Sequence, residues 1–338
     1  MKIVHELNQL STGGVERVIR NLIKFDKKNE HTIISYKDGD YRSELEKVGA
    51  RIVLLRDEND TIDMEADIIH VHTGGGDSRL ARQLGGHFPV VETIHSPVRS
   101  VLPSELVRRR IGVSKAVAAL NPDCDTIYNG LDIDELEPAL DAVDIRASLG
   151  IDPGALVIGR LGRLGHDKGI EDWLLAVYRL QLERHSVVPV IVGGPGVDDA
   201  RYFGRLKLMA ESLPVRGIKW VGHKTNIMDY LQIMDVFLYP SPTEGFGLVF
   251  AEAMLAGCTV VTYKTPVTFE CFGGYCLMTE QNIPALVDGL RKAIKPEVRG
   301  EFTGMPADFI KAEYTAERMS AEYQELYERC NSDIIVSR

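Results

Sequence analysis

Cysteine is scarce in this sequence of 338 residues, and long apolar runs are absent. The five cysteines are scattered and form no C-x-x-C pair, which favours reduced thiols in a cytosolic protein over a disulfide framework. The longest strongly apolar stretch, around residues 187–192, is far shorter than the ~20 residues that span a bilayer, and the first residues lack the apolar region of a signal peptide. These absences predict a cytoplasmic protein without a membrane-spanning segment.

Basic residues are also in the minority. The chain has 39 lysines and arginines against 49 aspartates and glutamates, so its formal net charge is −10. A nucleic-acid binder needs a basic face to neutralise phosphates, and this composition argues against nucleic acid as a partner. A few local cations could still hold a small anion. The hydrophobic fraction of 44% is typical of globular proteins, and the length suggests two domains.

Short β-branched stretches alternate with helical patterns from one end of the chain to the other. Several are continuous apolar runs, which are typical of parallel strands covered on both faces. The first series of predicted strands comprises residues 2–5, 32–35, 51–55, 68–71, 90–94, 111–113 and 126–128. The second series comprises residues 156–160, 188–192, 218–221, 236–239, 259–263 and 275–277. Because the pattern restarts, the sequence predicts an α/β fold of two doubly wound domains in tandem.

A change in composition marks the boundary between these domains. Around residues 137–144 the chain becomes acidic and loses apolar periodicity, and an Asp-Pro-Gly turn follows. We therefore expect a first Rossmann-like domain over residues 1–144 and a second over residues 145–313. Residues 314–330 carry an apolar stripe at helical spacing. We expect a terminal helix within residues 314–338 that packs back toward the first domain.

The most informative segment follows the predicted strand at residues 236–239. A Glu-Gly-Phe-Gly turn at residues 244–247 leads into a helix that begins near Leu248 and carries Glu252. Ligands of open α/β sheets bind outside the carboxyl ends of strands, where the first N–H groups of a helix can bind an anion. Two carboxylates beside such a site suit the hydroxyls of a sugar nucleotide. The alternative is that Glu244 only caps the turn and Glu252 lies on a solvated helix face.

Two further segments are rich in glycine. Arg163 and Lys168 stand five residues apart on the loop after the first strand of the second domain, where they could neutralise a diphosphate. The alternative for this segment is an ordinary solvated loop. In the first domain, Gly13 and Gly14 follow the first strand and would allow the backbone to approach a phosphate closely.

Taken together, these segments resemble family 4 of the glycosyltransferases, the retaining enzymes of the GT-B fold. In that fold, two Rossmann-like domains flank a cleft. The Glu-x7-Glu spacing around a Gly-Phe-Gly core is the most specific feature of the resemblance. The matching segments occur in family order at residues 13–16, 112–115, 128–132, 163–168, 192–195 and 244–252.

The resemblance implies transfer of a sugar from a nucleoside-diphosphate sugar to an acceptor hydroxyl, with retention of configuration and without a metal or other cofactor. The second domain would hold the donor and the first the acceptor, which could be a glycan, a lipid-linked saccharide or a small molecule. A lipid-linked acceptor would bring the protein to the inner face of a membrane as a peripheral protein.

The same resemblance assigns roles to individual residues. Arg163 and Lys168 would hold the diphosphate and stabilise the departing nucleotide, while Glu252 would bind the ribose hydroxyls. Glu244 would contact the hydroxyls of the donor sugar, and His95 would lie beside the anomeric carbon. The implied catalytic residues are His95, Arg163, Lys168 and Glu244. The implied donor-binding residues are Gly13, Gly14, Arg163, Lys168, Glu244, Gly245, Phe246, Gly247, Leu248 and Glu252, and no metal ligand is implied.

Two segments depart from the family pattern. Residues 193–196 lack the acidic residue that commonly follows the first glycine, which leaves the contacts to the base open. The segment between His95 and Ser114 is short, and because the acceptor is often shaped there, the acceptor stays open too.

Two further patterns stand outside the proposed site. His70 and His72 share one face of a strand like a metal pair, but no acidic third ligand is close in sequence, so we interpret them as structural. The run Arg108-Arg109-Arg110 is interpreted as a solvated face, with a contact to an anionic acceptor or lipid surface as the alternative.

Other functions compete with sugar transfer. A sugar-nucleotide epimerase uses the same two-domain fold, and a catalytically silent subunit could bind a nucleotide sugar in support of a partner enzyme. Product analysis separates transfer from epimerisation, and tight donor binding without turnover would indicate the silent subunit. A dinucleotide-dependent oxidoreductase fits less well, because residues 193–196 do not complete a G-x-G-x-x-G motif.

Overall fold

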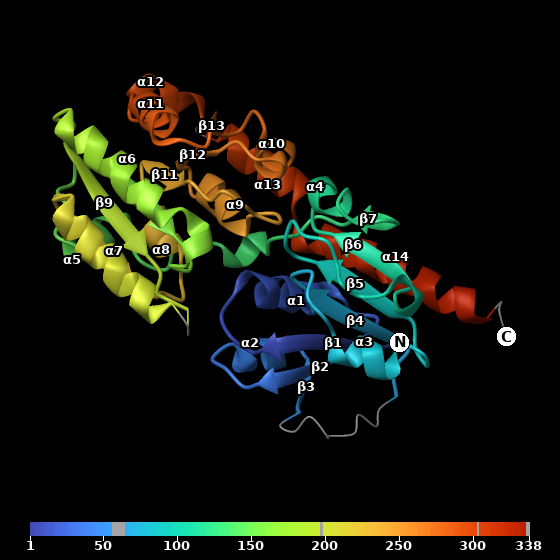
Figure 1. Ribbon diagram of the computed structural model, residues 1–338. Helices are drawn as coiled ribbons and strands as arrows, with labels where there is room; N and C mark the ends of the chain where they lie inside the picture. The colour runs from blue at the N-terminus through green and yellow to red at the C-terminus, as the bar shows by residue number, and fades with distance from the viewer. Residues whose placement is uncertain (56–64, 197–198, 303, 336–338) are drawn as a thin grey trace. The chain divides into compact units, whose positions relative to one another are not determined.

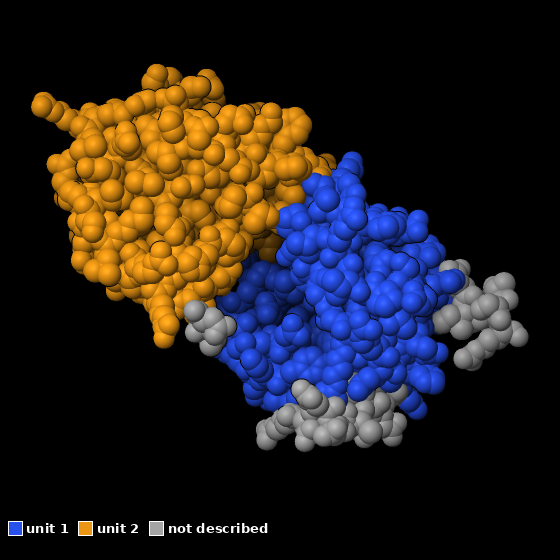
Figure 2. All heavy atoms as spheres, in the orientation of Figure 1, with its two compact units in different colours: residues 1–132, 314–338 blue, residues 133–313 orange. Residues whose placement is uncertain are grey.

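The computed structural model describes residues 1–55, 65–196, 199–302 and 304–335 (Figure 1). The chain forms two compact units, each with its own parallel sheet. Unit 1 comprises Met1–Asp132 and Tyr314–Arg338, and unit 2 comprises Ile133–Glu313, as coloured in Figure 2. Two doubly wound α/β units confirm the predicted fold class.

Unit 1 is built on a seven-stranded sheet with the strand order β3-β2-β1-β4-β5-β6-β7. Its strands are β1 (Lys2–Gln9), β2 (Glu30–Lys37), β3 (Arg51–Leu54), β4 (Ile68–Thr73), β5 (Val90–Ile94), β6 (Arg109–Gly112) and β7 (Cys124–Thr126). All neighbouring pairs among them are parallel. The strand order reverses between β1 and β4, which creates a switch point where open α/β sheets bind ligands.

Helices cover both faces of this sheet. They are α1 (Gly14–Phe25), α2 (Arg42–Lys47), α3 (Arg79–Leu84), α4 (Lys115–Ala118) and α14 (Ala316–Ile335), with a short 3-10 turn η1 (Ser104–Leu106). On one face, Val4 and Val71 pack with Leu80 of α3 in an apolar cluster. On the other face α14 packs against α1, and the hydroxyl of Tyr327 lies 2.6 Å from Nδ1 of His70 on β4. The last helix of the chain therefore completes the core of the first unit.

Unit 2 has a six-stranded parallel sheet with the order β10-β9-β8-β11-β12-β13. Its strands are β8 (Leu156–Leu161), β9 (Val187–Val192), β10 (Lys219–Gly222), β11 (Val236–Tyr239), β12 (Thr259–Tyr263) and β13 (Leu277–Thr279). Its helices are α5 (Ala142–Ser148), α6 (Ile170–Leu182), α7 (Ala200–Ser212), α8 (Met228–Leu231), α9 (Leu248–Leu255), α10 (Pro266–Phe272), α11 (Ile283–Ala293), α12 (Pro296–Glu301) and α13 (Met305–Glu313), with 3-10 turns η2 (Ile133–Glu135) and η3 (His166–Lys168). Trp173 of α6 and Leu290 of α11 are fully buried against the sheet.

Every predicted strand overlaps an observed one, but the unit boundary lies elsewhere than the sequence suggests. Unit 1 ends at Asp132, whereas the composition places the boundary at residue 144. The intervening segment is tied to unit 2, because the backbone N–H groups of Ala139 and Leu140 donate to Oδ1 of Asp229 at 2.7 and 2.9 Å. Acidic composition marks this segment as solvated, but its backbone contacts decide which unit it joins.

None of the described helices is both long and apolar enough to cross a membrane.

Candidate active site

The loop between β8 and α6 contains two of the residues singled out by the sequence, and glycines define its path. Gly169 has a φ of +59°, and a Cβ there would lie 1.9 Å from the carbonyl oxygen of Pro240, just after β11. Gly193, which follows β9, has a φ of +131°, and a Cβ there would lie 2.0 Å from the carbonyl oxygen of Gly162. The loops after β8, β9 and β11 therefore meet in close backbone contact at the carboxyl edge of the sheet.

Arg163 occupies the exposed side of this edge. Its guanidinium donates to Oδ2 of Asp199 at 2.7 Å and to Oδ1 of Asp167 at 2.6 Å, while about half of its side chain stays exposed. Partial burial works to lower the pKa of Arg163, but these two carboxylates outweigh it and raise the pKa. The side chain is thus a fixed cation with a solvent-facing side.

Lys168 lies deeper and joins the two most informative segments of the sequence. Its ammonium donates to Oε1 of Glu244 at 2.9 Å, and Oδ2 of Asp167 lies 3.2 Å away. Burial works to lower the pKa of Lys168, but the Glu244 carboxylate outweighs it and raises the pKa. Residues 76 positions apart in the sequence therefore form one charged pair.

The turn before α9 has the conformation that its glycines predict. Gly247 has a φ of +91°, and a Cβ there would lie 2.5 Å from the ring of Phe250, so only glycine fits without a shift. Glycine has no side chain to cap the helix that starts at Leu248, which leaves the first N–H groups for a ligand. Phe246 is buried against Phe272, so only its backbone and that of the adjacent Gly245 can face a ligand.

Glu252 lies one turn into α9, and only 1% of its surface is exposed. The alternative of a solvated helix face is therefore wrong for this residue. A buried carboxylate needs polar partners or a function, because its desolvation is costly. The burial of Glu252 agrees with a specific role. Binding of the ribose hydroxyls by Glu252 stays a prediction.

Sequence reasoning missed Arg160, on the buried strand β8. Its side chain is fully buried, and among the described residues its Nε and Nη1 have no hydrogen-bond partner. Its guanidinium lies 5.3 Å from the centre of the Tyr239 ring, at the end of β11. Burial lowers the pKa of Arg160 from its ordinary value and raises that of Tyr239 to about 12. The signal in the sequence was a single charged residue inside an apolar strand.

In unit 1, Gly13 and Gly14 lie at the start of α1, after β1. A Cβ on Gly13 would lie 2.4 Å from Oε2 of Glu16, so the glutamate folds back over the turn. Burial raises the pKa of Glu16 to about 7. The sequence pointed to Glu16 only as part of a motif, and its titration near neutral pH depends on packing.

His95 follows β5 at the carboxyl edge of the sheet of unit 1. Its backbone N–H donates to the carbonyl of Thr73 at 2.8 Å, and its Nε2 lies 3.1 Å from Nδ1 of His72. Burial lowers the pKa of His95 to about 4, so the ring is neutral near pH 7. Gly13, Gly14 and His95 thus belong to unit 1, and the other predicted site residues belong to unit 2.

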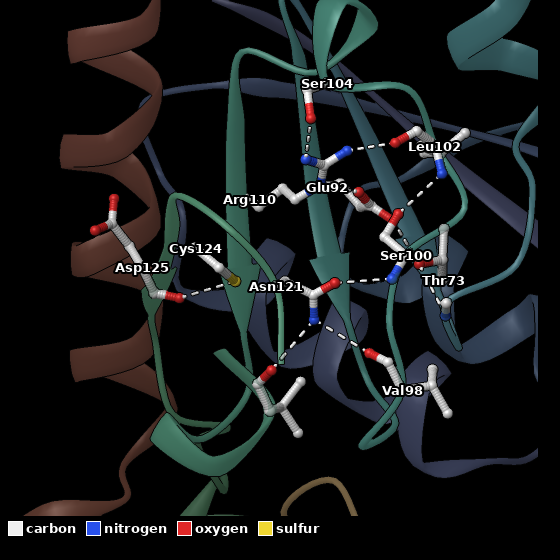
Figure 3. Close-up of polar contacts among 12 residues, drawn as sticks. Thr73, Glu92, Val98, Ser100, Leu102, Ser104, Arg110, Asn121, Cys124 and Asp125 are labelled. Atoms are coloured by element: carbon white, nitrogen blue, oxygen red, sulfur yellow. Dashed lines mark hydrogen bonds and ion pairs between the residues drawn. The ribbon is translucent and has the colours of Figure 1, made fainter. Parts of the chain in front are cut away.

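The loop after His95 is fastened by a buried polar network (Figure 3). Arg110 on β6 donates from Nε to Oε2 of Glu92 at 3.0 Å, and both side chains are buried. Ser100 and Thr73 donate to Oε1 of the same glutamate at 2.6 and 3.0 Å. The interpretation of residues 108–110 as a solvated run is therefore wrong for Arg110, which pairs with a glutamate of the neighbouring strand.

Three histidines of unit 1 come close enough to share a metal ion. One ring nitrogen each of His5, His70 and His72 lies within 4.8 Å of the others. The local sequence shows only the pair on β4, because His5 comes from β1, where it pairs in register with His70. Both ring nitrogens of His70 already have hydroxyl partners, Thr93 at 2.7 Å and Tyr327 at 2.6 Å.

Comparison with known proteins identifies the family. The sequence profile of Glycosyl transferases group 1 matches residues 141–315, just over half of the chain. The chain therefore belongs to this family, and its carboxyl-edge loops in unit 2 lie within the matched segment.

Individual relatives are similar over part of their length. The lipopolysaccharide core biosynthesis mannosyltransferase LpsB of Rhizobium meliloti is 30% identical over 164 residues, which cover 46% of this chain and 46% of that protein. The D-inositol 3-phosphate glycosyltransferase of Corynebacterium jeikeium is 29% identical over 212 residues, which cover 58% of this chain and 50% of that protein. The chain thus spans about half the length of these curated relatives.

The fold has well-matched neighbours among solved structures. HepE of Anabaena, solved in complex with UDP and glucose, superposes with a TM-score of 0.83 at 19% sequence identity, over 97% of this chain and 99% of that chain. A likeness of this kind shows the fold, which is GT-B.

Proposed function

We propose that this chain is a glycosyltransferase that moves a sugar from a nucleoside-diphosphate sugar to an acceptor hydroxyl, with retention of configuration and without a metal. The observation that carries the proposal is the 2.9 Å contact between Lys168 and Glu244. It joins a loop that bears two cations to a loop that bears a carboxylate and an uncapped helix start. A diphosphate linked to a sugar needs cations and N–H groups for one part and acceptor oxygens for the other.

The cations would act on the leaving group. As the bond between the anomeric carbon and the diphosphate breaks, negative charge grows on the phosphate oxygens. Lys168 and Arg163 are already charged and held in place, so they stabilise this charge without reorganisation. The contacts of Arg163 with Asp167 and Asp199 are partly exposed, and pairs of that kind contribute only about 0–1 kcal/mol. Exchange of a carboxylate for a phosphate therefore costs little.

The remaining residues would bind the two ends of the donor. Glu252 would accept from the ribose hydroxyls, and Glu244 would accept from the hydroxyls of the sugar next to the reacting carbon. His95 and the turn at Gly13 and Gly14 would approach the donor from unit 1. Retention follows if the acceptor oxygen attacks on the face that the diphosphate leaves, and the departing phosphate oxygen takes the acceptor proton. No protein nucleophile is then required.

The names of the relatives guide the choice of substrates. HepE was solved with UDP and glucose, and the curated relatives are named for lipopolysaccharide core and inositol phosphate. We therefore propose UDP-sugars as the first donors to test, and a saccharide, a lipid-linked saccharide or a small polyol as acceptor. A lipid-linked acceptor would place the protein at a membrane surface as a peripheral protein.

A panel of UDP-, GDP- and ADP-sugars in a thermal-shift assay tests donor binding without an acceptor. A ligand at about 100 times its Kd stabilises the folded state by about 2.7 kcal/mol, which is enough to rank the panel. The donor that ranks first is then incubated with candidate acceptors in excess chelator, and the anomeric configuration of the product is read by NMR. A stabilising donor that is epimerised without acceptor, a requirement for manganese, or an inverted product would each contradict part of the proposal.

A further inference from the structure

Arg160 carries a positive charge inside unit 2. It is the penultimate residue of β8 (Leu156–Leu161), and its side chain is fully buried. A guanidinium stays protonated in proteins and has five N–H donors to satisfy. Within the described residues, Nη2 of Arg160 lies 3.5 Å from the carbonyl oxygen of Arg163, whereas Nε and Nη1 have no hydrogen-bond partner. Hydrogen bonds therefore compensate little of the cost of burying this cation.

No carboxylate in the described part of the chain forms an ion pair with Arg160. The carboxylates of this edge are held instead by the cations of the loop after β8, in the pairs Lys168–Glu244, Arg163–Asp167 and Arg163–Asp199. These pairs bring together two cations and three carboxylates. A diphosphate that approached them would meet an excess of negative charge if no further cation contributed.

The guanidinium of Arg160 lies directly below this group of charges. The centre of the Tyr239 ring, at the end of β11, is 5.3 Å from it. A Cβ on Gly162, at the start of the loop, would lie 3.4 Å from the hydroxyl oxygen of Tyr239. Burial lowers the pKa of Arg160, and the side chains of Tyr239, Tyr202 and Glu244 offset this only in part. The unpaired cation is thus close enough to the loop to act on what binds there.

We propose that Arg160 is a positioning residue whose unpaired charge, buried below the loop of Arg163 and Lys168, attracts an anionic diphosphate to this edge. It acts through its electric field and not by contact, because its side chain is fully buried. In the free chain this charge lowers stability, since a buried ion without a partner keeps its desolvation cost. A bound anion offsets part of that cost. That the anion is the diphosphate of a sugar donor rests on the proposed function, whereas the unpaired charge does not.

A purely structural role is the alternative for Arg160. The side chain would then serve to hold the Tyr239 ring and the backbone of Arg163. Its one hydrogen bond, at 3.5 Å, is at the long limit for such contacts, and a buried water would satisfy a nitrogen without neutralising the charge. The two roles predict opposite effects on the free chain. A structural arginine stabilises it, whereas an unpaired buried cation destabilises it.

Arg160→Met separates these roles, because it removes the charge and keeps a long, flexible apolar side chain. We expect the urea midpoint of the ligand-free chain to rise. The Kd for inorganic pyrophosphate, measured by calorimetry at pH 7.5, should increase on the order of ten-fold. A unit charge about 10 Å away has an effect of this size when the effective dielectric constant is about 20.

Arg146→Met is the matched control in the same unit. Arg146 is a mostly buried arginine that does have a carboxylate partner, Asp235 at 3.6 Å, and it also donates to the carbonyl oxygen of Ala155, just before β8. It therefore lies at the opposite, amino edge of the sheet. Its loss should lower the urea midpoint and leave the Kd for pyrophosphate unchanged.

Each other outcome for Arg160→Met contradicts the proposal. A lower urea midpoint, or a variant that does not fold, would show that the arginine is structural. An unchanged Kd for pyrophosphate would overturn the proposal as well, as would a wild-type chain that does not bind pyrophosphate.

Kinetics separate this inference from the proposed function. With the donor that ranks first in the thermal-shift panel, Arg160→Met should lower kcat/KM for transfer about ten-fold. Arg146→Met should keep the wild-type value. A wild-type chain that binds pyrophosphate with the expected dependence on Arg160 but transfers no sugar would refute the proposed function and leave this inference standing. Sugar transfer that Arg160→Met does not affect would refute only this inference.

Discussion

The carboxyl edges of the two sheets carry polar groups in opposite physical states. In unit 2 the edge bears Arg163 and Lys168, both charged and paired with carboxylates on glycine-rich loops. In unit 1 the edge bears His95, a neutral ring whose Nε2 lies 3.1 Å from Nδ1 of His72. Unit 2 therefore offers a strong local potential for an anion, whereas unit 1 offers a neutral ring that can form hydrogen bonds.

The two units also use ion pairs differently. Glu92 and Arg110 of unit 1 are buried and hold a loop in place, whereas Arg163 and its carboxylates stay partly exposed in unit 2. A buried pair is costly to break, while an exposed pair exchanges readily with water or ligand. Charge in unit 1 thus holds a buried loop in place, whereas the charged pairs of Arg163 in unit 2 stay accessible to solvent.

The largest expected effect tests that contrast through stability. Arg110→Ala leaves Glu92 buried and unpaired, so the free energy of unfolding should fall by about 3–5 kcal/mol. Arg163→Ala, the matched exposed arginine, should change it by only about 0–1 kcal/mol. Urea unfolding followed by circular dichroism measures both. Equal effects of the two substitutions would remove the distinction between the units.

The next effect concerns catalysis in unit 2. Lys168→Ala removes a preorganised cation that would stabilise the departing diphosphate. We therefore expect kcat to fall on the order of 10²–10³-fold. Arg163→Ala should lower both kcat and donor affinity, because its guanidinium is the solvent-facing cation of the pair. Steady-state kinetics on the purified variants decide this, with the exposed Lys207→Ala as the control that keeps wild-type turnover. A fully active Lys168→Ala would show that the edge of unit 2 is not the site of the leaving group.

A pH-dependent effect is expected in unit 1. The pKa of Glu16 is raised from 4.5 to about 7, so the folded state keeps a proton that the unfolded state loses as the pH rises between these values. Stability is therefore lost across that window, up to about 3 kcal/mol. Glu16→Gln should be stabilising at pH 8 and nearly neutral at pH 4. Chemical unfolding at both pH values measures this, and the exposed Glu105→Gln should show no such difference.

The smallest effect separates the two glutamates of unit 2. Glu252→Gln should weaken binding of the free nucleoside diphosphate by up to about 10²-fold, since a hydrogen bond to a charged group contributes roughly 1.5–3 kcal/mol. Glu244→Gln should leave that binding nearly intact and lower kcat, because its contact changes as the glycosidic bond breaks. Calorimetric titration with the bare nucleotide makes the comparison. If Glu244→Gln bound the bare nucleotide more weakly than Glu252→Gln, the two assigned roles would be reversed or wrong.

The fold was predictable because its signals are local. Continuous apolar stretches such as β11 (Val236–Tyr239) mark strands covered on both faces. The loop that carries Arg163 and Lys168 was predictable for the same reason, because both residues and their glycines lie within a short span. The unit to which the segment after Asp132 belongs was not predictable from the sequence. It depends on the contact of Ala139 with Asp229, which lies 90 residues further along the chain.

What the sequence by itself determined is the alternation of strands and helices, the glycine turns and the cations placed upon them, since each depends on neighbours in the chain. Only the tertiary structure decided that Arg110 is buried, that Glu16 titrates near neutral pH and that His5 and His31 reach His95 through His72. The physical reason is that burial and register arise between strands. A histidine on β1 acquires partners on β2 and β4 only when the sheet has formed.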